Sequence, residues 1–276
     1  MWFPGKGFIK EIIRPWLKYK FKLYYTILSM FQYEMLRRAN MFKTAAFILP
    51  NGYKILIIKS IPSILRSILQ TYSEIFIYGE YFKHPDYLIE RGDTVLDLGA
   101  FVGLYTLSIA HKASRVIAVE PNPVAYKLLR YNIAINKLED KVATANIALA
   151  DYEGEAVLHI EDYLMSSSTI VNHWHHTLRH SLKSTVKVTT LDNFLKELHI
   201  KNIDLMKVDV EGAELAILKG GAKSLENGII RRIVMEIHLG LYNIKDLINI
   251  LKSYGYQIDL FEIREDTALL YAKSIK

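Results

Sequence analysis

The sequence predicts an α/β fold built on a doubly wound, mostly parallel sheet of seven strands, with an N-terminal helical and hairpin extension. Between residues 94 and 254, apolar runs of strand length alternate five times with segments of helical periodicity. A glycine turn follows the first of these strands, and an acidic residue follows the second. Two further apolar runs near the C-terminal end are joined by a short charged connection, which is typical of an antiparallel hairpin.

The individual elements follow from this alternation. We expect strands at residues 94–98, 116–120, 142–148, 204–210, 231–237, 256–263 and 268–274. We expect helices at residues 103–112, 123–137, 191–198, 213–220 and 243–254. Before them, Asn51-Gly52 predicts a hairpin turn between two apolar runs, and short helical pieces follow it. The chain therefore divides into a basic amphipathic helical extension (1–45), a hairpin and helical lead-in (46–91) and a core domain (92–276).

The N-terminal extension predicts a long amphipathic helix from about Pro15 to Ala39. Its apolar residues recur at helical spacing along one face: Leu17, Phe21, Tyr24, Leu28, Phe31 and Met35. Three partners suit such a face, namely the protein's own body, a second copy in a homodimer, or an anionic membrane surface.

Charge is concentrated in the same region. Residues 1–43 carry nine Lys and Arg against two Glu, or +7, while the whole chain of 276 residues carries +6, so the remainder is near −1. This distribution does not favour nucleic acid as a partner of the core domain. The absence of cysteine excludes disulfides and thiolate chemistry. With no recognisable secretory signal, we expect a cytoplasmic protein, peripheral to the membrane if the helix binds lipid.

The glycine turn after the first core strand predicts a nucleoside site. Its pattern is Asp97-x-Gly99-x-x-x-Gly103, in which Gly99 permits a tight turn and Gly103 lets the helix start close to a ligand. Phe101 stands where a dinucleotide fingerprint has its middle glycine, which argues against a pyrophosphate. Glu120 ends the second strand, where a carboxylate can accept both hydroxyls of a ribose.

This spacing resembles the first motif of class I S-adenosylmethionine (SAM) methyltransferases. We therefore expect SAM to be bound by Asp97, Gly99, Ala100, Phe101, Gly103, Glu120, Asn122, Asn146 and Ile147. Asp97 would meet the positive groups of SAM directly or through water. Asn122 would either reach the ribose or fix the turn before Pro123. Asn146 and Ile147 would end the third strand beside the adenine, although Asn146 could instead satisfy its own turn.

Four further polar residues follow the fourth and fifth strands. Asp209 and Glu211 alternate along the chain, as do Glu236 and His238, so each pair shares a face. At the carboxyl edge of the sheet they would form the catalytic group, with His238 or Glu211 as the general base for a hydroxyl acceptor. Two alternatives stay open. One is a buried His238–Glu236 hydrogen bond without a catalytic role, and the other is a Mg²⁺ ion that the spacing permits but does not require.

Two polar runs lie between the third and fourth of these strands. Ser166-Ser167-Ser168 is small and polar, and it could line the same cleft. The run from Asn172 to His180 holds four of the nine histidines, but their spacing matches no zinc pattern. That run is either a surface loop or an acceptor-side loop in which Trp174 stacks on a ring.

Several segments together resemble the FkbM family of SAM-dependent methyltransferases. The matching pieces, in order, are EIFIYGEY (74–81), DTVLDLGAFVGLYTL (93–107), VIAVEPNP (116–123), NIALAD (146–151), TLDNF (190–194), KVDVEGAE (207–214) and MEIH (235–238). The resemblance implies a Rossmann-like class I methyltransferase domain at residues 92–276. It also implies methylation of hydroxyl groups on sugars or natural products. Residues 1–45 match nothing in the family.

The leading functional hypothesis is SAM-dependent O-methylation of a sugar, a glycolipid or another small-molecule acceptor. One alternative is an RNA methyltransferase that holds phosphates with its basic N-terminal segment. Another is a non-catalytic SAM-binding protein attached to a membrane.

Overall fold

The computed structural model describes residues 44–58, 62–161, 166–170, 181–263 and 267–276. The expected helix from Pro15 to Ala39 and the histidine-containing run 172–180 lie outside these described residues.

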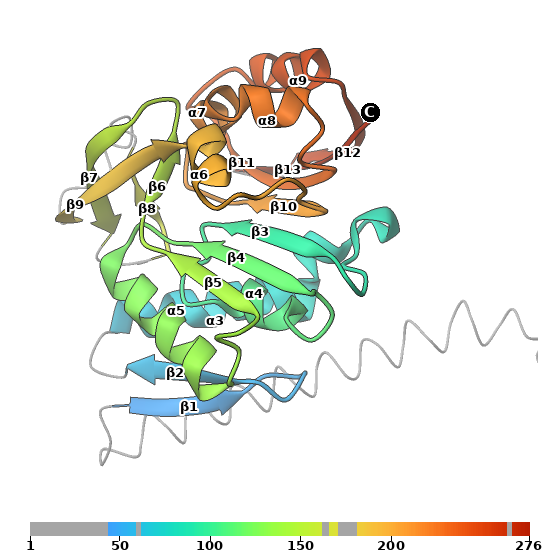
Figure 1. Cartoon of the computed structure of the whole chain (residues 1–276). Coiled ribbons are helices and arrows are strands. Elements are labelled where there is room, and N and C mark those ends of the chain that lie inside the picture. The colour runs from blue at the N-terminus through green and yellow to red at the C-terminus, as the bar shows by residue number, and fades with distance from the viewer. Residues whose placement is uncertain (1–43, 59–61, 162–165, 171–180, 264–266) are drawn as a thin grey trace, which may run out of the picture.

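A sheet of seven strands forms the centre of the fold (Figure 1). In spatial order it contains β12 (Tyr256–Ile263), β13 (Thr267–Ser274), β11 (Arg232–His238), β10 (Leu205–Val208), β3 (Thr94–Leu98), β4 (Arg115–Val119) and β5 (Val142–Ala145). Strand β13 runs antiparallel to both of its neighbours, and the remaining pairs in this sheet are parallel. The predicted doubly wound sheet with an antiparallel closing hairpin is therefore confirmed.

The chain order reverses on either side of β3. From β3 the chain winds outward to β4 and β5, and it later returns to place β10 on the opposite side of β3. In parallel sheets the crevice at such a switch point is where ligands bind, because the loops after the two central strands diverge there.

Helices cover both faces of the sheet (Figure 1). One apolar core joins the sheet to the helices α3 (Pro62–Tyr72), α4 (Leu104–Ile109) and α5 (Pro123–Ile135). The second core joins the opposite face to α6 (Leu191–Glu197), α7 (Glu214–Gly220), α8 (Ala222–Glu226) and α9 (Ile244–Ser253). Neighbouring strand residues alternate between the cores: Val95 belongs to the first, and Leu96 to the second.

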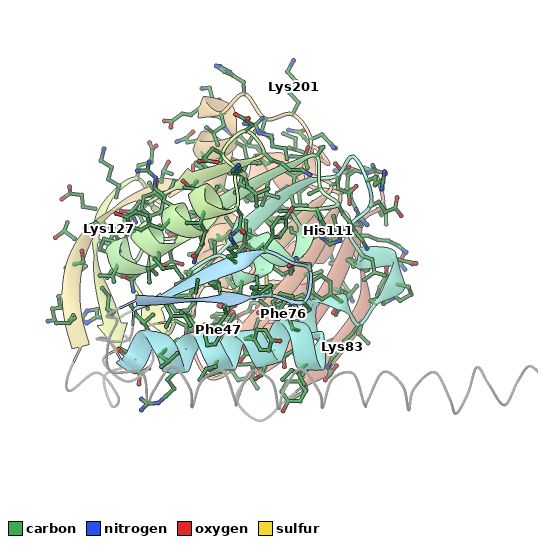
Figure 2. All side chains as sticks on the ribbon, turned by 90° about the horizontal axis from the view of Figure 1, so that it is seen from below. Phe47, Phe76, Lys83, His111, Lys127 and Lys201 are labelled. Atoms are coloured by element: carbon green, nitrogen blue, oxygen red, sulfur yellow. The ribbon has the colours of Figure 1, made fainter. Side chains whose placement is uncertain are left out.

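The predicted hairpin consists of β1 (Thr44–Ile48) and β2 (Lys54–Ile58), with Asn51-Gly52 in the turn. Asn132 of α5 and Asn136, the C-cap of the same helix, accept hydrogen bonds from backbone N–H groups of β2, which fixes the hairpin to that helix. Figure 2, seen from below, shows the hairpin with Phe47 beside α3. Phe47 is buried in the first core, and Phe76 packs against it.

The rest of the lead-in is helical but irregular. After α3 come a π-helical turn, η2 (Ser73–Tyr78), and two short 3₁₀ turns, η3 (Glu80–Phe82) and η4 (Pro85–Tyr87). Ile75 and Tyr81 are buried, so this segment is anchored to the body of the molecule. π-Helical turns are uncommon and often occur at functional sites.

The sequence analysis missed a second sheet. It contains β6 (Ala148–Ala150), β9 (Ser181–Thr190), β7 (Gly154–Glu161) and β8 (Ser168–Thr169), in that spatial order. The expected strand at 142–148 is divided, because β5 ends at Ala145 and β6 joins this second sheet. No helix among the described residues is both long enough and apolar enough to cross a membrane.

Candidate functional site

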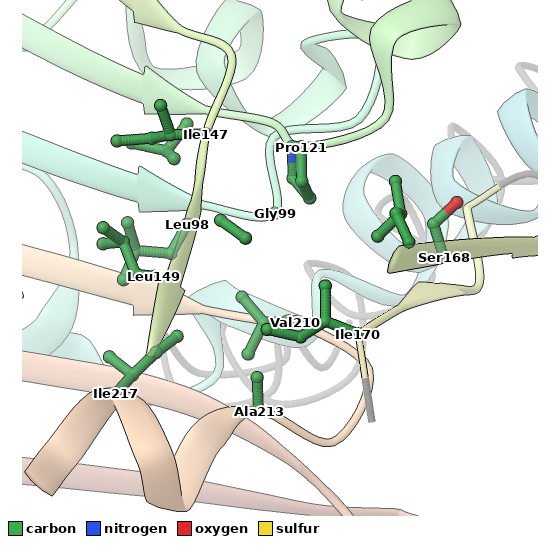
Figure 3. A pocket seen from close by; sticks show the side chains of 13 residues that line it. Leu98, Gly99, Pro121, Ile147, Leu149, Ser168, Ile170, Val210, Ala213 and Ile217 are labelled. Carbon is green, nitrogen blue, oxygen red and sulfur yellow. The ribbon is translucent and has the colours of Figure 1, made fainter. Parts of the chain in front are cut away.

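An apolar pocket opens at the switch point, beyond the carboxyl ends of β3, β4 and β10 (Figure 3). It encloses about 360 Å³, part of which is open to solvent. The main sheet contributes Leu98 and Val119, and α7 contributes Ile217. Leu149, Leu158, Ser168 and Ile170 come from the second sheet or its vicinity, so the sheet that the sequence analysis missed forms one wall.

A larger and more polar cleft adjoins this pocket and shares Gly99, Pro121, Ser168 and Val210 with it. Its space is about 1230 Å³, including open solvent. The four proposed catalytic residues all line it: Asp209, Glu211, Glu236 and His238. Its lining from the lead-in includes Gln70, Thr71, Glu74, Ile75 and Tyr81.

The glycine loop between β3 and α4 is held against both neighbouring strands. The N–H groups of Gly99 and Ala100 each donate to the Val119 carbonyl, at 3.0 Å. Gly99 has a φ of +74°, and a Cβ atom built there would lie 1.7 Å from the Asp209 carbonyl oxygen. Glycine is therefore required both by backbone conformation and by the close approach of the chain after β10. Gly99, Ala100 and Phe101 line the cleft, whereas Gly103 begins α4 behind it.

Glu120 is buried at the end of β4 and also lines the cleft. Its Oε2 accepts a hydrogen bond from the Phe101 N–H at 2.7 Å, and its Oε1 accepts one from the Asn122 N–H at 2.8 Å. Burial raises the pKa of Glu120 to about 7, against these two backbone donors that lower it. Each carboxylate oxygen keeps a further lone pair for a ribose hydroxyl.

Asn122 and Asn146 have structural roles in this conformation. The Asn122 side chain accepts from the N–H groups of Val124 and Ala125, which makes it the N-cap of α5. The Asn146 amide donates to the carbonyls of Glu120 and Pro121, at 2.8 and 2.9 Å. Both side chains therefore fix turns, as the sequence analysis allowed for each as the alternative to a contact with SAM. Ile147 lines the apolar pocket as expected, although it follows β5 and does not end it.

Asp97 lies behind the loop and not in the lining of the cleft. It is fully buried, and its Oδ2 accepts from the Thr106 hydroxyl at 2.6 Å. Its Oδ1 lies 3.4 Å from the Nζ atom of Lys207, the residue directly across from it on β10. Among the described residues Oδ1 has no hydrogen-bond partner, and Asp97 is absent from the described lining of the cleft. The expected role of Asp97 toward SAM, directly or through water, stays a prediction.

Lys207 is a site residue that the sequence analysis missed. Its buried Nζ donates to the Gly99 carbonyl at 2.9 Å and lies 3.3 Å from Asp209 Oδ2. Burial alone would lower the pKa of Lys207, but Asp209 and Asp97 outweigh burial and raise it. The lysine is therefore a cation beneath the loop. A lysine in the otherwise apolar run Leu205–Val208 was the signal that could have revealed it.

Tyr81 of η3 connects two of the predicted catalytic acids. Its hydroxyl lies 2.9 Å from Asp209 Oδ2 and 3.0 Å from Glu236 Oε2. One hydroxyl proton cannot bond both oxygens, so the pair of contacts is best satisfied when Glu236 itself carries a proton. Burial, followed by the charge of Asp209, raises the pKa of Glu236 to about 7. Burial would also raise the pKa of Asp209, but the positive charges of Lys207 and His238 outweigh burial, and the pKa of Asp209 is lowered.

His238 lies between two carboxylates. Its Nε2 is 3.1 Å from Glu211 Oε2, and its Nδ1 is 2.8 Å from Glu214 Oε1. Glu214 is fully buried and also accepts from Tyr242 and from the Gly212 N–H. Burial would lower the pKa of His238, but Glu211 and Glu214 together raise it to about 12.

These contacts argue against His238 as the general base, which was one of two candidates together with Glu211. Both ring nitrogens face carboxylate oxygens, and the imidazolium is the form that donates to both. A histidine that keeps its proton at neutral pH cannot accept one from a substrate. The expected buried pairing with Glu236 is also replaced, because the partners of His238 are Glu211 and Glu214.

The arrangement bears on a metal ion as well. Ligand atoms of Asp209, Glu211 and His238 lie within 4.8 Å of one another, and Glu236 is not part of that set. These three residues could hold a metal ion, but hydrogen bonds of His238 to Glu211 and Glu214 satisfy the same contacts, so the geometry does not require one.

The residues present suit SAM. The apolar pocket is shaped by branched side chains that suit a purine ring, and Glu120 stands at its edge as a buried acceptor for a ribose. The pocket continues past the Gly99 backbone into the polar cleft, which is where an acceptor would enter.

Comparison with known proteins agrees with this geometry. The family model described as the methyltransferase FkbM domain matches residues 97–258, more than half of the chain. The methyltransferase sdnD of Sordaria araneosa is 30% identical over 175 residues, which cover 52% of this chain and 68% of that protein. The 31-O-demethyl-FK506 methyltransferase FkbM of Streptomyces tacrolimicus is 26% identical, over 66% of this chain and 82% of that protein.

Two further similarities were found. The hexuronic acid methyltransferase AglP of Haloferax volcanii is 25% identical, over 64% of this chain and 69% of that protein. The crystal structure of methyltransferase FkbM from Methylobacillus flagellatus superimposes with a TM-score of 0.51 at 18% identity, over 75% of this chain and 53% of that one, which supports the fold. The family match, together with the nucleoside-shaped pocket, places this chain in the FkbM family of SAM-dependent methyltransferases.

Proposed function

We propose that this enzyme transfers a methyl group from SAM to a hydroxyl group of a carbohydrate or another small polar molecule. The observation that carries the proposal is the continuity of an apolar nucleoside-sized pocket with a cleft lined by carboxylates. When bound, SAM supplies an electrophilic methyl group that needs no further activation. The protein then has to position the acceptor and remove its proton.

Residues at the pocket edge would hold the cofactor. Ile147 and its apolar neighbours would contact the adenine, and Glu120 would accept hydrogen bonds from the ribose. Lys207 holds the Gly99 carbonyl and so keeps the loop in place. Because Lys207 is paired with Asp97 and Asp209, its charge is neutralised before a cationic cofactor arrives.

Glu236 is the general base that we propose. It lines the cleft, and its raised pKa of about 7 suits a group that must accept a proton at neutral pH. Glu236 would take the hydroxyl proton of the acceptor, while the cofactor would supply the methyl group and its sulfur would keep the electrons of the broken bond. Tyr81 would hold Glu236 and Asp209 in position. His238 would keep Glu211 oriented toward the cleft.

Two relatives support an oxygen acceptor on a carbohydrate or natural product. One is named for a hexuronic acid and the other for 31-O-demethyl-FK506. In addition, the site lacks the aromatic-proline sequence that methyltransferases of base amino groups often carry after the fourth strand, where this chain has Asp209-Val210-Glu211-Gly212.

The proposal can be tested with SAM carrying a tritiated methyl group. The full-length enzyme would be incubated with separated glycan, lipid, small-metabolite and RNA fractions of a cell extract. We expect alkali-stable label in the glycan, glycolipid or small-metabolite fractions, as methyl ethers are, and full activity in the presence of EDTA. Label confined to RNA would refute the proposal, and SAM binding without label in any fraction would indicate a non-catalytic protein.

RNA is the weaker candidate. A strand of RNA brings a phosphate at every nucleotide, and proteins hold phosphates with Lys and Arg. Lys207, the lysine among the described lining residues of the cleft, is already paired with two aspartates.

A further inference from the structure

We propose that the acceptor enters the cleft without negative charge near its reacting hydroxyl, and that Glu74 is a specificity-determining residue that excludes anionic acceptors. This inference rests on the proposed hydroxyl methylation and deepens it. It divides carbohydrate acceptors into a favoured class of neutral polyols and a disfavoured class of uronates, sulfates and phosphates, so this chain would differ in preference from its relative named for a hexuronic acid.

Glu74 approaches the cleft from the lead-in. It lies in the first turn of η2, and its Oε1 accepts a hydrogen bond from the Gln70 amide at 3.0 Å. The next residue, Ile75, is buried, which anchors the π-helical turn and fixes where Glu74 lies. Glu74 lines the same cleft as Asp209 and Glu236. Burial, with a smaller contribution from the charges of these two acids, raises the pKa of Glu74 to about 7, so it is mostly a carboxylate at pH 8.

The cations of the cleft are already engaged. Lys207 is paired with Asp97 and Asp209. His238 is paired with Glu211 and Glu214. Among the described residues that line the cleft, these two are the cationic side chains, so an incoming carboxylate or phosphate would find no unpaired positive partner there.

Repulsion completes the selection. At pH 8, where Glu74 and Glu236 are mostly ionised, an anionic acceptor would lose its hydration on entry and would face the carboxylates of Glu74, Asp209 and Glu236. Specificity of this kind comes from penalising the wrong ligand and not from binding the right one more tightly. A neutral polyol is favoured instead, because its hydroxyl groups donate hydrogen bonds to the carboxylates of the cleft. Gln70, Thr71 and Ser166 to Ser168 offer it further uncharged partners.

The test compares neutral and anionic acceptors directly. A glycan and small-metabolite extract is separated by anion exchange into neutral and acidic pools, and each pool is incubated at pH 8 with full-length enzyme and tritiated SAM. For the wild type we expect label in the neutral pool, at least tenfold above the acidic pool. For Glu74→Gln we expect the acidic-to-neutral ratio to rise about tenfold, which corresponds to about 1.4 kcal/mol.

Glu90→Gln is the matched control, since Glu90 is an exposed acid of the same lead-in that does not line the cleft. It should leave the ratio unchanged, and calorimetry with SAM would check that both variants are folded. Preferential label in the acidic pool would overturn the inference while leaving hydroxyl methylation intact. An unchanged ratio in Glu74→Gln would overturn the role of Glu74, and label in neither pool would overturn the proposed function as well.

Discussion

At the scale of single residues, Glu120 combines two tasks. It holds the glycine loop through Phe101 and the start of α5 through Asn122, and it stands at the edge of the nucleoside pocket. Sequence position could predict the carboxylate, because an acid at the end of the second strand follows from the strand pattern. Its backbone partners could not be predicted, because they depend on how two separate loops meet.

We predict that Glu120→Ala weakens SAM binding by about 1–3 kcal/mol, because the ribose loses a charged acceptor and the loop loses its support. Isothermal titration calorimetry measures the change. Glu120→Gln keeps one carbonyl acceptor, so its SAM affinity should fall between that of Glu120→Ala and that of the wild type. Unchanged affinity in a folded Glu120→Ala protein would remove Glu120 from the cofactor site.

The pKa of Glu236 predicts how methyl transfer depends on pH. Burial and Asp209 raise it to about 7, so Glu236 is mostly protonated at pH 6 and mostly a carboxylate at pH 8. Because a base must be deprotonated to act, kcat at saturating SAM and acceptor should rise through pH 7 and level off above it. Glu236→Gln should reduce kcat by about 10²-fold or more and should remove the rise of kcat through pH 7, while SAM affinity is retained. A flat wild-type profile between pH 6 and 8 would exclude Glu236 as the base.

His238 and Glu214 predict a stability effect. Replacing His238 by Ala leaves the fully buried Glu214 without its cationic partner, which should cost about 3–5 kcal/mol of unfolding free energy. Tyr242→Phe removes one hydrogen bond to the same carboxylate and should cost about 1.5–3 kcal/mol. Urea denaturation of the two variants compares them. Equal and small losses of unfolding free energy in the two variants would show that the Glu214 carboxylate is not held as an ion pair.

At the scale of elements, the loop after β3 depends on the chain after β10. A Cβ atom at Gly99 would lie 1.7 Å from the Asp209 carbonyl oxygen, whereas one at Gly103 would lie 2.7 Å from the Leu129 Cδ1 atom. A backbone oxygen cannot move aside without shifting its strand, but the end of a leucine side chain can rotate. The two glycines look equivalent in the sequence, and this contact distinguishes them.

Gly99→Ala should therefore lower both thermal stability and SAM affinity, and it should do so more than Gly103→Ala. Both glycines have positive φ, at +74° and +93°, so the backbone strain is shared and the difference reports the steric contact. Differential scanning fluorimetry with and without SAM measures both quantities. The idea fails if Gly103→Ala is the more damaging change.

The same scale shows why periodicity revealed one sheet and not the other. Strands buried on both faces, such as residues 116–119 of β4, form continuous apolar runs that stand out in a sequence. Strands β7 and β9 carry exposed residues, among them Val157 and Leu182, mixed with charged ones, so their pattern resembles that of a polar loop. Two strands of this sheet also pair across about thirty residues, which local periodicity cannot report.

At the scale of the whole molecule, the order of strands and helices could be predicted because each unit obeys the alternation of a doubly wound sheet. By contrast, the sequence could not predict that the lead-in lies next to the catalytic acids. Tyr81 and Asp209 are separated by 128 positions, and no pattern in either segment refers to the other. For the same reason, Glu74 was not among the predicted site residues.

Residues 1–43 lie outside the described residues, and the described residues that line the pocket or the cleft all have a number of 70 or above. We therefore expect a protein that lacks residues 1–43 to bind SAM with unchanged affinity. If the basic helix predicted there binds an anionic surface, full-length protein should co-sediment with phosphatidylserine vesicles in low salt and the truncated protein should not. Co-sedimentation of both proteins would place any lipid contact elsewhere.

The contact between Tyr81 and the catalytic acids has a consequence for how this enzyme could diversify. The family model covers residues 97–258, while Gln70, Glu74 and Tyr81 precede it. The residue proposed to screen acceptors, Glu74, thus precedes the matched residues 97–258, in a segment (74–81) that itself resembles the family. Mutations between α3 and η3 could redirect the enzyme to another acceptor while sparing the inherited chemistry. Conversely, grafting residues 62–82 onto a relative is a direct route to exchanging acceptor preference between enzymes.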